Sequence, residues 1–301
     1  MHRVTSISTL GPHAQRFVER HAVACVAAVF PRSCYLEAHG DFLCIGEESI
    51  GRGPLNALLS GAGWTRLSES LPPVETRAHI ARGTLHISSI ALDATRAEPW
   101  RPASWPSARR AESVACALRR LQRFAAEQAP VDGLARVVLG TAGDRPSALD
   151  RAALPRVRRL RAWLTGDAPP SVDLLGLGPG LTPSGDDVLG GMLVALHAVG
   201  QAGMAAELYA ALAGAAPTAT SPISAAFLRA AAEGLGCEAL HAAIAAVLEG
   251  WAEAVSDRAE ALGRIGHTSG WDALAGAMLV LQAFGSTQRQ PAGVAWAQIC
   301  E

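Results

Sequence analysis

The spacing of hydrophobic residues changes near residue 104. Before that point the apolar residues form short runs, some of them alternating with polar residues, and glycine-containing turns separate the runs. Such runs predict β-strands, which we expect at 34–39, 42–45 and 85–90. The segment 9–29 fits a short helix, although its part from 22 to 30 could equally form a buried strand.

Beyond residue 106 the apolar residues recur every three or four positions, which is the spacing of amphipathic helices. We expect helices at 107–128, 147–164, 201–214, 221–234, 237–255, 256–262 and 269–284. The helix at 147–164 should be interrupted near Pro155, because proline lacks the N–H group that a helix interior uses. Residues 134–139 predict a strand or a buried turn, and 98–106, rich in proline, is the predicted linker.

Together the two patterns predict an α+β protein. We expect a small β-rich domain over 1–104, built as an antiparallel or barrel-like sheet, and a larger, mainly α-helical domain over 105–301. The chain has 301 residues, of which 50% are hydrophobic. That length is sufficient for two domains and a sizeable core.

The most distinctive segment is 174–196, which reads LLGLGPGLTPSGDDVLGGMLVAL. It joins a glycine-rich loop to the start of an apolar helix. Glycines allow positive φ angles, and the first turn of a helix has unpaired N–H groups and a partial positive charge, so this junction predicts an anion site. The spacing is neither GxxxxGK[ST] nor GxGxxG, and the chain contains no lysine. A nucleotide-binding P-loop or Rossmann loop is therefore not expected.

The start of this helix is repeated 85 residues further along the chain. Residues 184–196 and 269–281 share six identities in thirteen positions, including the pattern S-G-x-D-x-L-x-G. Ser-x-x-Asp before an apolar run is typical of a capping box. Capping alone would explain the serine and aspartate of each copy, Ser184 with Asp187 and Ser269 with Asp272, and the same box is expected at 147–150.

The two copies share a spacing that predicts contact between their helices. Asp187 and Gly191 lie four residues apart and hence on one helix face, as do Asp272 and Gly276. If the helices cross at these glycines, their starts converge on one cleft. The polar residues brought together would be Thr182, Ser184, Asp186, Asp187, Thr268, Ser269 and Asp272. A third hydroxyl-rich helix start, with Thr220 and Ser221, lies in the same half of the chain.

Composition narrows the possible functions. A formal net charge of −1, with 18% charged residues, argues against a nucleic-acid-binding surface. The arginine runs near 109, 119 and 156–161 have helical spacing and are interpreted as solvated faces. No apolar run predicts a membrane span or a signal peptide, and the cysteines show no CxxC spacing. We therefore expect a cytoplasmic protein without a zinc site or a disulfide framework.

Three segments resemble the AllH family: GLGPGLTPSGDD, TSPISAAFLRAAAEG and IGHTSGWDALAG. The resemblance is specific over about 170–285, where the central motif is long and unusual. In the N-terminal half it is weak and rests mainly on Gly53-Pro54 and the β-like pattern. Family members are similar to a subunit of oxamate carbamoyltransferase, which in anaerobic allantoin breakdown, a route of purine degradation, exchanges a carbamoyl group between oxalurate and phosphate. The resemblance implies this transferase activity, small anionic substrates such as oxamate and carbamoyl phosphate, and AllG-like and FdrA-like partner subunits.

Carbamoyl transfer needs hydrogen-bond donors on the phosphate and on the carbonyl oxygen that becomes negative. The residues assigned to binding the small anion are Gly178, Gly180, Thr182, Ser184, Gly185, Thr220, Ser221, Thr268 and Ser269. The candidate catalytic residues are Asp186, Asp187, Asp272 and His267. Of these, Asp186 and His267 are the candidate bases for the attacking amide nitrogen.

Aspartates beside an anion need a physical explanation. Either a bridging Mg²⁺ or Mn²⁺ neutralises them, or they are structural caps that point away from the pocket. We favour the second explanation for Asp187 and Asp272. Two other functions stay open: a non-catalytic anion-binding or scaffolding subunit whose partner holds the active site, and a metal-dependent hydrolase of an amide or ureido bond.

Overall fold

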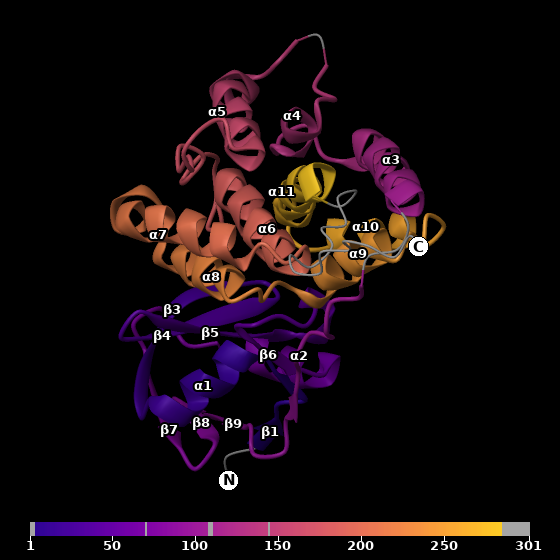
Figure 1. Ribbon diagram of the computed structural model, residues 1–301. Helices are drawn as coiled ribbons and strands as arrows, with labels where there is room; N and C mark the ends of the chain where they lie inside the picture. The colour runs from indigo at the N-terminus through magenta and orange to yellow at the C-terminus, as the bar shows by residue number, and fades with distance from the viewer. Residues whose placement is uncertain (1–3, 70, 108–110, 144, 285–301) are drawn as a thin grey trace, which may run out of the picture.

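A curled sheet fills the N-terminal half of the protein (Figure 1). The computed structural model describes residues 4–69, 71–107, 111–143 and 145–284. The strands are β1 (Val4–Ser6), β2 (Thr9–Leu10), β3 (Val23–Phe30), β4 (Ser33–Ala38), β5 (Asp41–Glu47), β6 (Asn56–Leu59), β7 (Arg77–Ala81), β8 (Thr84–Ile87), β9 (Ile90–Asp93) and β10 (Glu98–Pro99). In this part of the chain the spatial order is β1-β9-β8-β7-β3-β4-β5-β6-β2-β10.

The first strands make the sheet curl. β1 and β2 are consecutive in the chain, yet β1 pairs with β9 and β2 pairs with β6, far apart in the strand order. Between them the N–H of Ile7 donates to Asp93 and that of Ser8 donates to Leu58, both at 2.8 Å. One short segment thus joins two distant parts of the sheet. The β-rich half is confirmed, as a mixed sheet in which β1/β9, β5/β6 and β2/β10 are parallel pairs.

Two helices complete the core of this half. They are α1 (Pro12–Arg20) and α2 (Gly61–Ser68), and a single turn of 3-10 helix, η1 (Glu48–Ile50), follows β5. Phe17 of α1 and Trp64 of α2 are buried in one cluster with the sheet residues Leu36 and Leu43. The ambiguous segment 9–29 therefore contains both a helix and a strand, separated at His21.

The C-terminal half is helical, as predicted (Figure 1). Its helices are α3 (Ala111–Gln128), α4 (Ala135–Leu139), α5 (Ala148–Thr165), α6 (Ser184–Ala198), α7 (Ala202–Ala219), α8 (Pro222–Ala232), α9 (Glu238–Leu248), α10 (Val255–Gly263) and α11 (Ser269–Phe284). α8 packs on the sheet, where Ile223 and Ala226 contact Phe42, Cys44 and Leu55. Among the described helices, none combines the length and the apolar character needed to span a membrane.

Two local predictions were wrong. Residues 135–139 form the short helix α4 instead of a strand or turn, and α5 runs without interruption through Pro155. Pro155 is exposed. Arg151, whose carbonyl would accept from the missing N–H, is exposed too, so water can take the place of that donor.

Helices α6 and α11 cross in direct backbone contact, and the crossing predicted at the two glycines is confirmed. A Cβ atom on Gly191 would lie 1.9 Å from the carbonyl oxygen of Ala273, and one on Gly276 would lie 1.9 Å from that of Val188. These two contacts are equivalent, because a shift of 85 residues converts one into the other. The sequence repeat is therefore also a reciprocal contact between the helices.

Substitution at this crossing tests the packing. We expect Gly276→Ala to lower the free energy of unfolding by roughly 2–3 kcal/mol, because the added methyl group collides with backbone that cannot move aside cheaply. The matched control is Gly190→Ala, also within α6, where the added methyl meets only side-chain atoms at 3.9 Å or more. That variant should gain about 0.5–1 kcal/mol. Equal effects of the two substitutions in urea unfolding would contradict the close contact.

Candidate functional site

The helix crossing brings the starts of α6 and α11 together. The hydroxyl oxygen of Thr182 lies 3.1 Å from that of Ser269, and the hydroxyl oxygen of Ser184 lies 3.4 Å from that of Thr268. Residues 87 and 84 positions apart in the sequence thus meet in space. Six of the seven polar residues predicted to converge on one cleft form two groups, each built from both helix starts, and the seventh, Asp186, lies in neither.

The serines and aspartates of the repeat do not cap their own helices. Ser184 is the first helical residue of α6, the N-cap is Pro183, and no side chain caps the helix. The alternative explanation of Ser184 and Asp187 as a capping box therefore does not hold, because the serine stands one position too late. The box predicted at 147–150 is present, with both of its hydrogen bonds.

Each aspartate instead has the serine of the other helix as its neighbour. The hydroxyls of Ser269 and Thr182 donate hydrogen bonds to the carboxyl of Asp187, which favours its charged form. The hydroxyls of Ser184 and Thr268 do the same for Asp272. We call Thr182, Asp187 and Ser269 the first corner, and Ser184, Thr268 and Asp272 the second corner.

The second corner is closed by α4. Asp272 is 0% exposed, and its Oδ1 accepts hydrogen bonds from the backbone N–H groups of Leu134 at 2.7 Å and Ala135 at 2.8 Å. Burial raises the pKa of Asp272 to about 6, against the opposing effect of these donors. The expectation that Asp272 is a structural cap holds in a changed form: it caps α4, not α11.

The first corner opens into a pocket of about 490 Å³ between the sheet and the helices. Asp187 lines this pocket, and its Oδ2 has no hydrogen-bond partner among the described residues. Burial is the main cause that raises the pKa of Asp187 well above its ordinary value, and the nearby charges of Asp272 and Asp186 add to it. The favoured expectation that Asp187 points away from the pocket is wrong.

The sheet supplies pocket residues that the sequence did not reveal. Tyr35, Cys44 and Asn56 line the pocket opposite α6. Burial raises the pKa of Tyr35 well above 10 and that of Cys44 to about 12, so both side chains are neutral. Arg32, in the turn between β3 and β4, also lines the pocket and is exposed. No pattern in the sequence indicated which strands would face α6.

Asp186 anchors the glycine-rich loop. Its Oδ1 accepts the N–H of Gly176 at 2.6 Å, and its Oδ2 accepts the hydroxyls of Ser224, at 2.5 Å, and Thr220. Ser221 continues this network, since its hydroxyl donates to the carbonyl of Leu181 at 2.6 Å. Both oxygens of Asp186 are thus occupied, which suits a structural role better than that of a base.

The glycine-rich loop has the predicted backbone conformation, but its glycine N–H groups do not converge on the pocket. Gly176, Gly178 and Gly180 all have positive φ angles, as expected. The N–H of Gly185, however, donates to the carbonyl of Leu177 at 2.8 Å and is not free for a ligand. Neither Gly178 nor Gly180 lines the pocket at the first corner.

His267 lies outside both corners. Its side chain is 76% exposed, and its Nε2 is 2.6 Å from an oxygen of Asp132. The structure therefore does not bring this candidate base to the pocket. Within the described ranges, no group of three or more His, Cys, Asp or Glu side chains could hold a metal ion.

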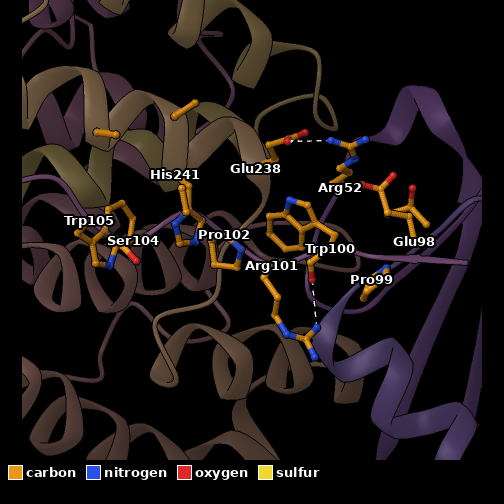
Figure 2. A pocket seen from close by; sticks show the side chains of 14 residues that line it. Arg52, Glu98, Pro99, Trp100, Arg101, Pro102, Ser104, Trp105, Glu238 and His241 are labelled. Atoms are coloured by element: carbon orange, nitrogen blue, oxygen red, sulfur yellow. Dashed lines mark hydrogen bonds and ion pairs between the residues drawn. The ribbon is translucent and has the colours of Figure 1, made fainter.

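A second pocket, of about 430 Å³, lies where the predicted linker packs on α9 (Figure 2). Trp105 stacks on His241 with ring centroids 4.4 Å apart, and Trp100 meets the same ring edge-on. An ion pair between Arg52 and Glu238 joins the two halves at the rim of this pocket. Burial lowers the pKa of His241 to about 4, so its ring is neutral near pH 7. The linker is thus packed against the helical half.

A pocket lined mainly by apolar side chains, with a carboxyl and a few hydroxyls among them, is typical of a site for a small molecule. The family model of the oxamate carbamoyltransferase subunit AllH matches residues 174–281. The resemblance predicted from the motifs is thereby confirmed over this region, which contains both corners except for the contacts from α4. No curated protein and no solved structure matches the chain.

The charge of Asp272 predicts how stability depends on pH. Because its pKa is about 6 when folded and 3.8 when unfolded, the folded state binds its proton more tightly. Stability should therefore fall as pH rises from about 4 to about 6, by roughly 3 kcal/mol from this group, and then level off.

Comparison of the unfolding free energies of the unsubstituted chain and Asp272→Asn between pH 4 and pH 7 checks this effect. The asparagine keeps an acceptor for α4 but does not titrate. The unfolding free energy of the variant minus that of the unsubstituted chain should therefore rise between pH 4 and pH 6. Parallel pH profiles would show that Asp272 does not titrate in this range.

Proposed function

We propose that this chain is a subunit of an oxamate carbamoyltransferase-like enzyme and that the pocket at the first corner holds the acceptor amide. The observation that carries the proposal is the position of Asp187 at the base of this pocket, with an oxygen that lacks a hydrogen-bond partner in the described structure. The AllH family match, which includes Thr182, Asp187 and Ser269, supports a role in carbamoyl transfer.

The reaction requires a base. The amide nitrogen of the acceptor forms a bond to the carbamoyl carbon, the bond from that carbon to the phosphate oxygen breaks, and the nitrogen loses a proton. An ordinary aspartate is a weak base at neutral pH, but one whose pKa is raised by burial is better matched to this step. In this proposal Asp187 takes the proton, in place of Asp186 and His267.

The hydroxyls beside Asp187 have a second task in the proposed reaction. The carbonyl oxygen gains negative charge as the new bond forms, and fixed donors stabilise that charge most effectively in a site that excludes water. The hydroxyls of Thr182 and Ser269 lie 3.1 Å apart beside Asp187 and line the pocket. Once the carboxyl of Asp187 has taken the proton, their hydroxyl hydrogens can turn from it to the carbonyl oxygen. Their positions are fixed by the helix crossing.

The negative groups of the substrates need a cation, and Arg32 is the proposed one. It is the basic residue among those that line the pocket, and in the described structure its guanidinium forms no ion pair. Its place in an exposed turn lets it reach a phosphate or carboxylate at the mouth of the pocket.

Partner subunits of the AllG-like and FdrA-like kind, and a cytoplasmic location, complete the proposal.

Substitution of Asp187 tests the proposal in the assembled enzyme. With the partner subunits present and oxamate and carbamoyl phosphate as substrates, we expect Asp187→Asn to lower kcat at least 100-fold, because the base is lost. Ser269→Ala should lower kcat about tenfold or more, because one donor to the developing charge is lost.

The control is Asp167→Asn, at an exposed aspartate that accepts a hydrogen bond of 2.6 Å from the hydroxyl of Thr165. It should retain full activity. If Asp187→Asn assembles with the partners and transfers carbamoyl groups at the unsubstituted rate, this chain is a scaffold and its partner carries the chemistry.

A further inference from the structure

The groups that bind Asp272 in the second corner indicate which groups of a ligand would bind Asp187 in the first. The 85-residue shift places Asp187 on Asp272 and Ser184 on Ser269, and each aspartate has a serine and a threonine as neighbours. The corners differ in what lies beyond the carboxyl. At Asp272 the start of α4 presents two N–H groups, from Leu134 and Ala135. At Asp187 the corresponding space is the pocket.

We propose that the ligand of this pocket carries a primary amide or ureido group whose N–H donors bind Asp187, as α4 binds Asp272, and that this group is joined to an apolar body, which oxamate lacks. The inference rests on the proposed function in naming the amide as the reacting group. It goes beyond that function in assigning the contact to Asp187 and in giving the substrate an apolar body.

The walls of the pocket support the apolar body. Side chains from α6 and the helices that surround it line most of its depth, among them Val194, Phe227, Leu228, Leu240, Leu262 and Ile265. A volume of about 490 Å³ lies in the range that holds drug-sized ligands. Oxamate, with six non-hydrogen atoms and no apolar group, would leave most of this wall in contact with water.

The charges in the pocket argue against a strongly anionic ligand in its depth. Asp186 and Asp187 line the pocket, and Arg32 lies at an exposed turn. A carboxylate placed against Asp187 would face a second acid, whereas an amide offers N–H groups to it. Burial raises the pKa of both aspartates, and at Asp272 the two N–H donors oppose that rise.

Binding of matched ligands to the full chain tests the inference without any transfer reaction. Titration calorimetry at pH 8 would compare 4-methylpentanamide with 4-methylpentanoate, which differ only in the amide group, and with acetamide, which lacks the apolar body. We expect 4-methylpentanamide to bind at least tenfold more tightly than either of the others. Equal or tighter binding of the carboxylate or of acetamide, or no binding of the amide, would overturn the inference.

A variant gives an independent readout with opposite signs. Asp187→Asn should weaken the amide at least tenfold and strengthen the carboxylate, because the substitution removes a negative charge and adds an N–H donor. Asp167→Asn should change neither affinity. The comparison of ligands on the unsubstituted chain remains decisive if Asp187→Asn does not fold.

The outcomes separate this inference from the proposed function. Amide binding without carbamoyl transfer by the assembled enzyme would overturn the proposed transferase and keep the assignment of Asp187. Carbamoyl transfer to oxamate, without tighter binding of 4-methylpentanamide, would overturn this inference and keep the proposed transferase.

Discussion

The backbone contact between α6 and α11 fixes the positions of the hydroxyls and carboxyls in both corners of the candidate site. Gly191 and Gly276 have no side chains, so the two helices approach until each glycine touches a carbonyl of the other. This proximity places the serine of each helix beside the carboxyl of the other. Any larger residue at either glycine would separate the helices and, with them, the groups that form each corner.

The reciprocal contact produces two corners, of which one is closed by protein and the other lines a pocket. Around Asp272 the short helix α4 closes the space, and the carboxyl serves the stability of the fold. Around Asp187 the sheet and α8 leave a pocket that the carboxyl lines. One oxygen of each carboxyl, Oδ2, has no hydrogen-bond partner among the described residues, so the difference between the corners is the pocket at Asp187 and the two N–H donors at Asp272. Duplicated elements therefore provide one structural and one candidate functional aspartate, and the packing of neighbouring elements decides which is which.

Much of this arrangement could be predicted from the sequence. The 3–4 spacing gave the helices, and the repeated S-G-x-D-x-L-x-G pattern led to the crossing at Gly191 and Gly276. The exchange of partners between the corners could not be predicted, because a capping box and a pair of crossed serines and aspartates have the same sequence pattern. The roles of Tyr35 and Arg32 were also hidden, since they depend on how a distant sheet packs against α6.

A crystal structure of the chain with 4-methylpentanamide would test the central claim most directly, through the distance from the amide nitrogen to the nearest carboxyl oxygen of Asp187. The account predicts a hydrogen bond of about 2.7–3.2 Å, with the methyl groups against Leu228 and Phe227. An amide seated at the glycine-rich loop or in the linker pocket, with the first corner empty, would contradict it.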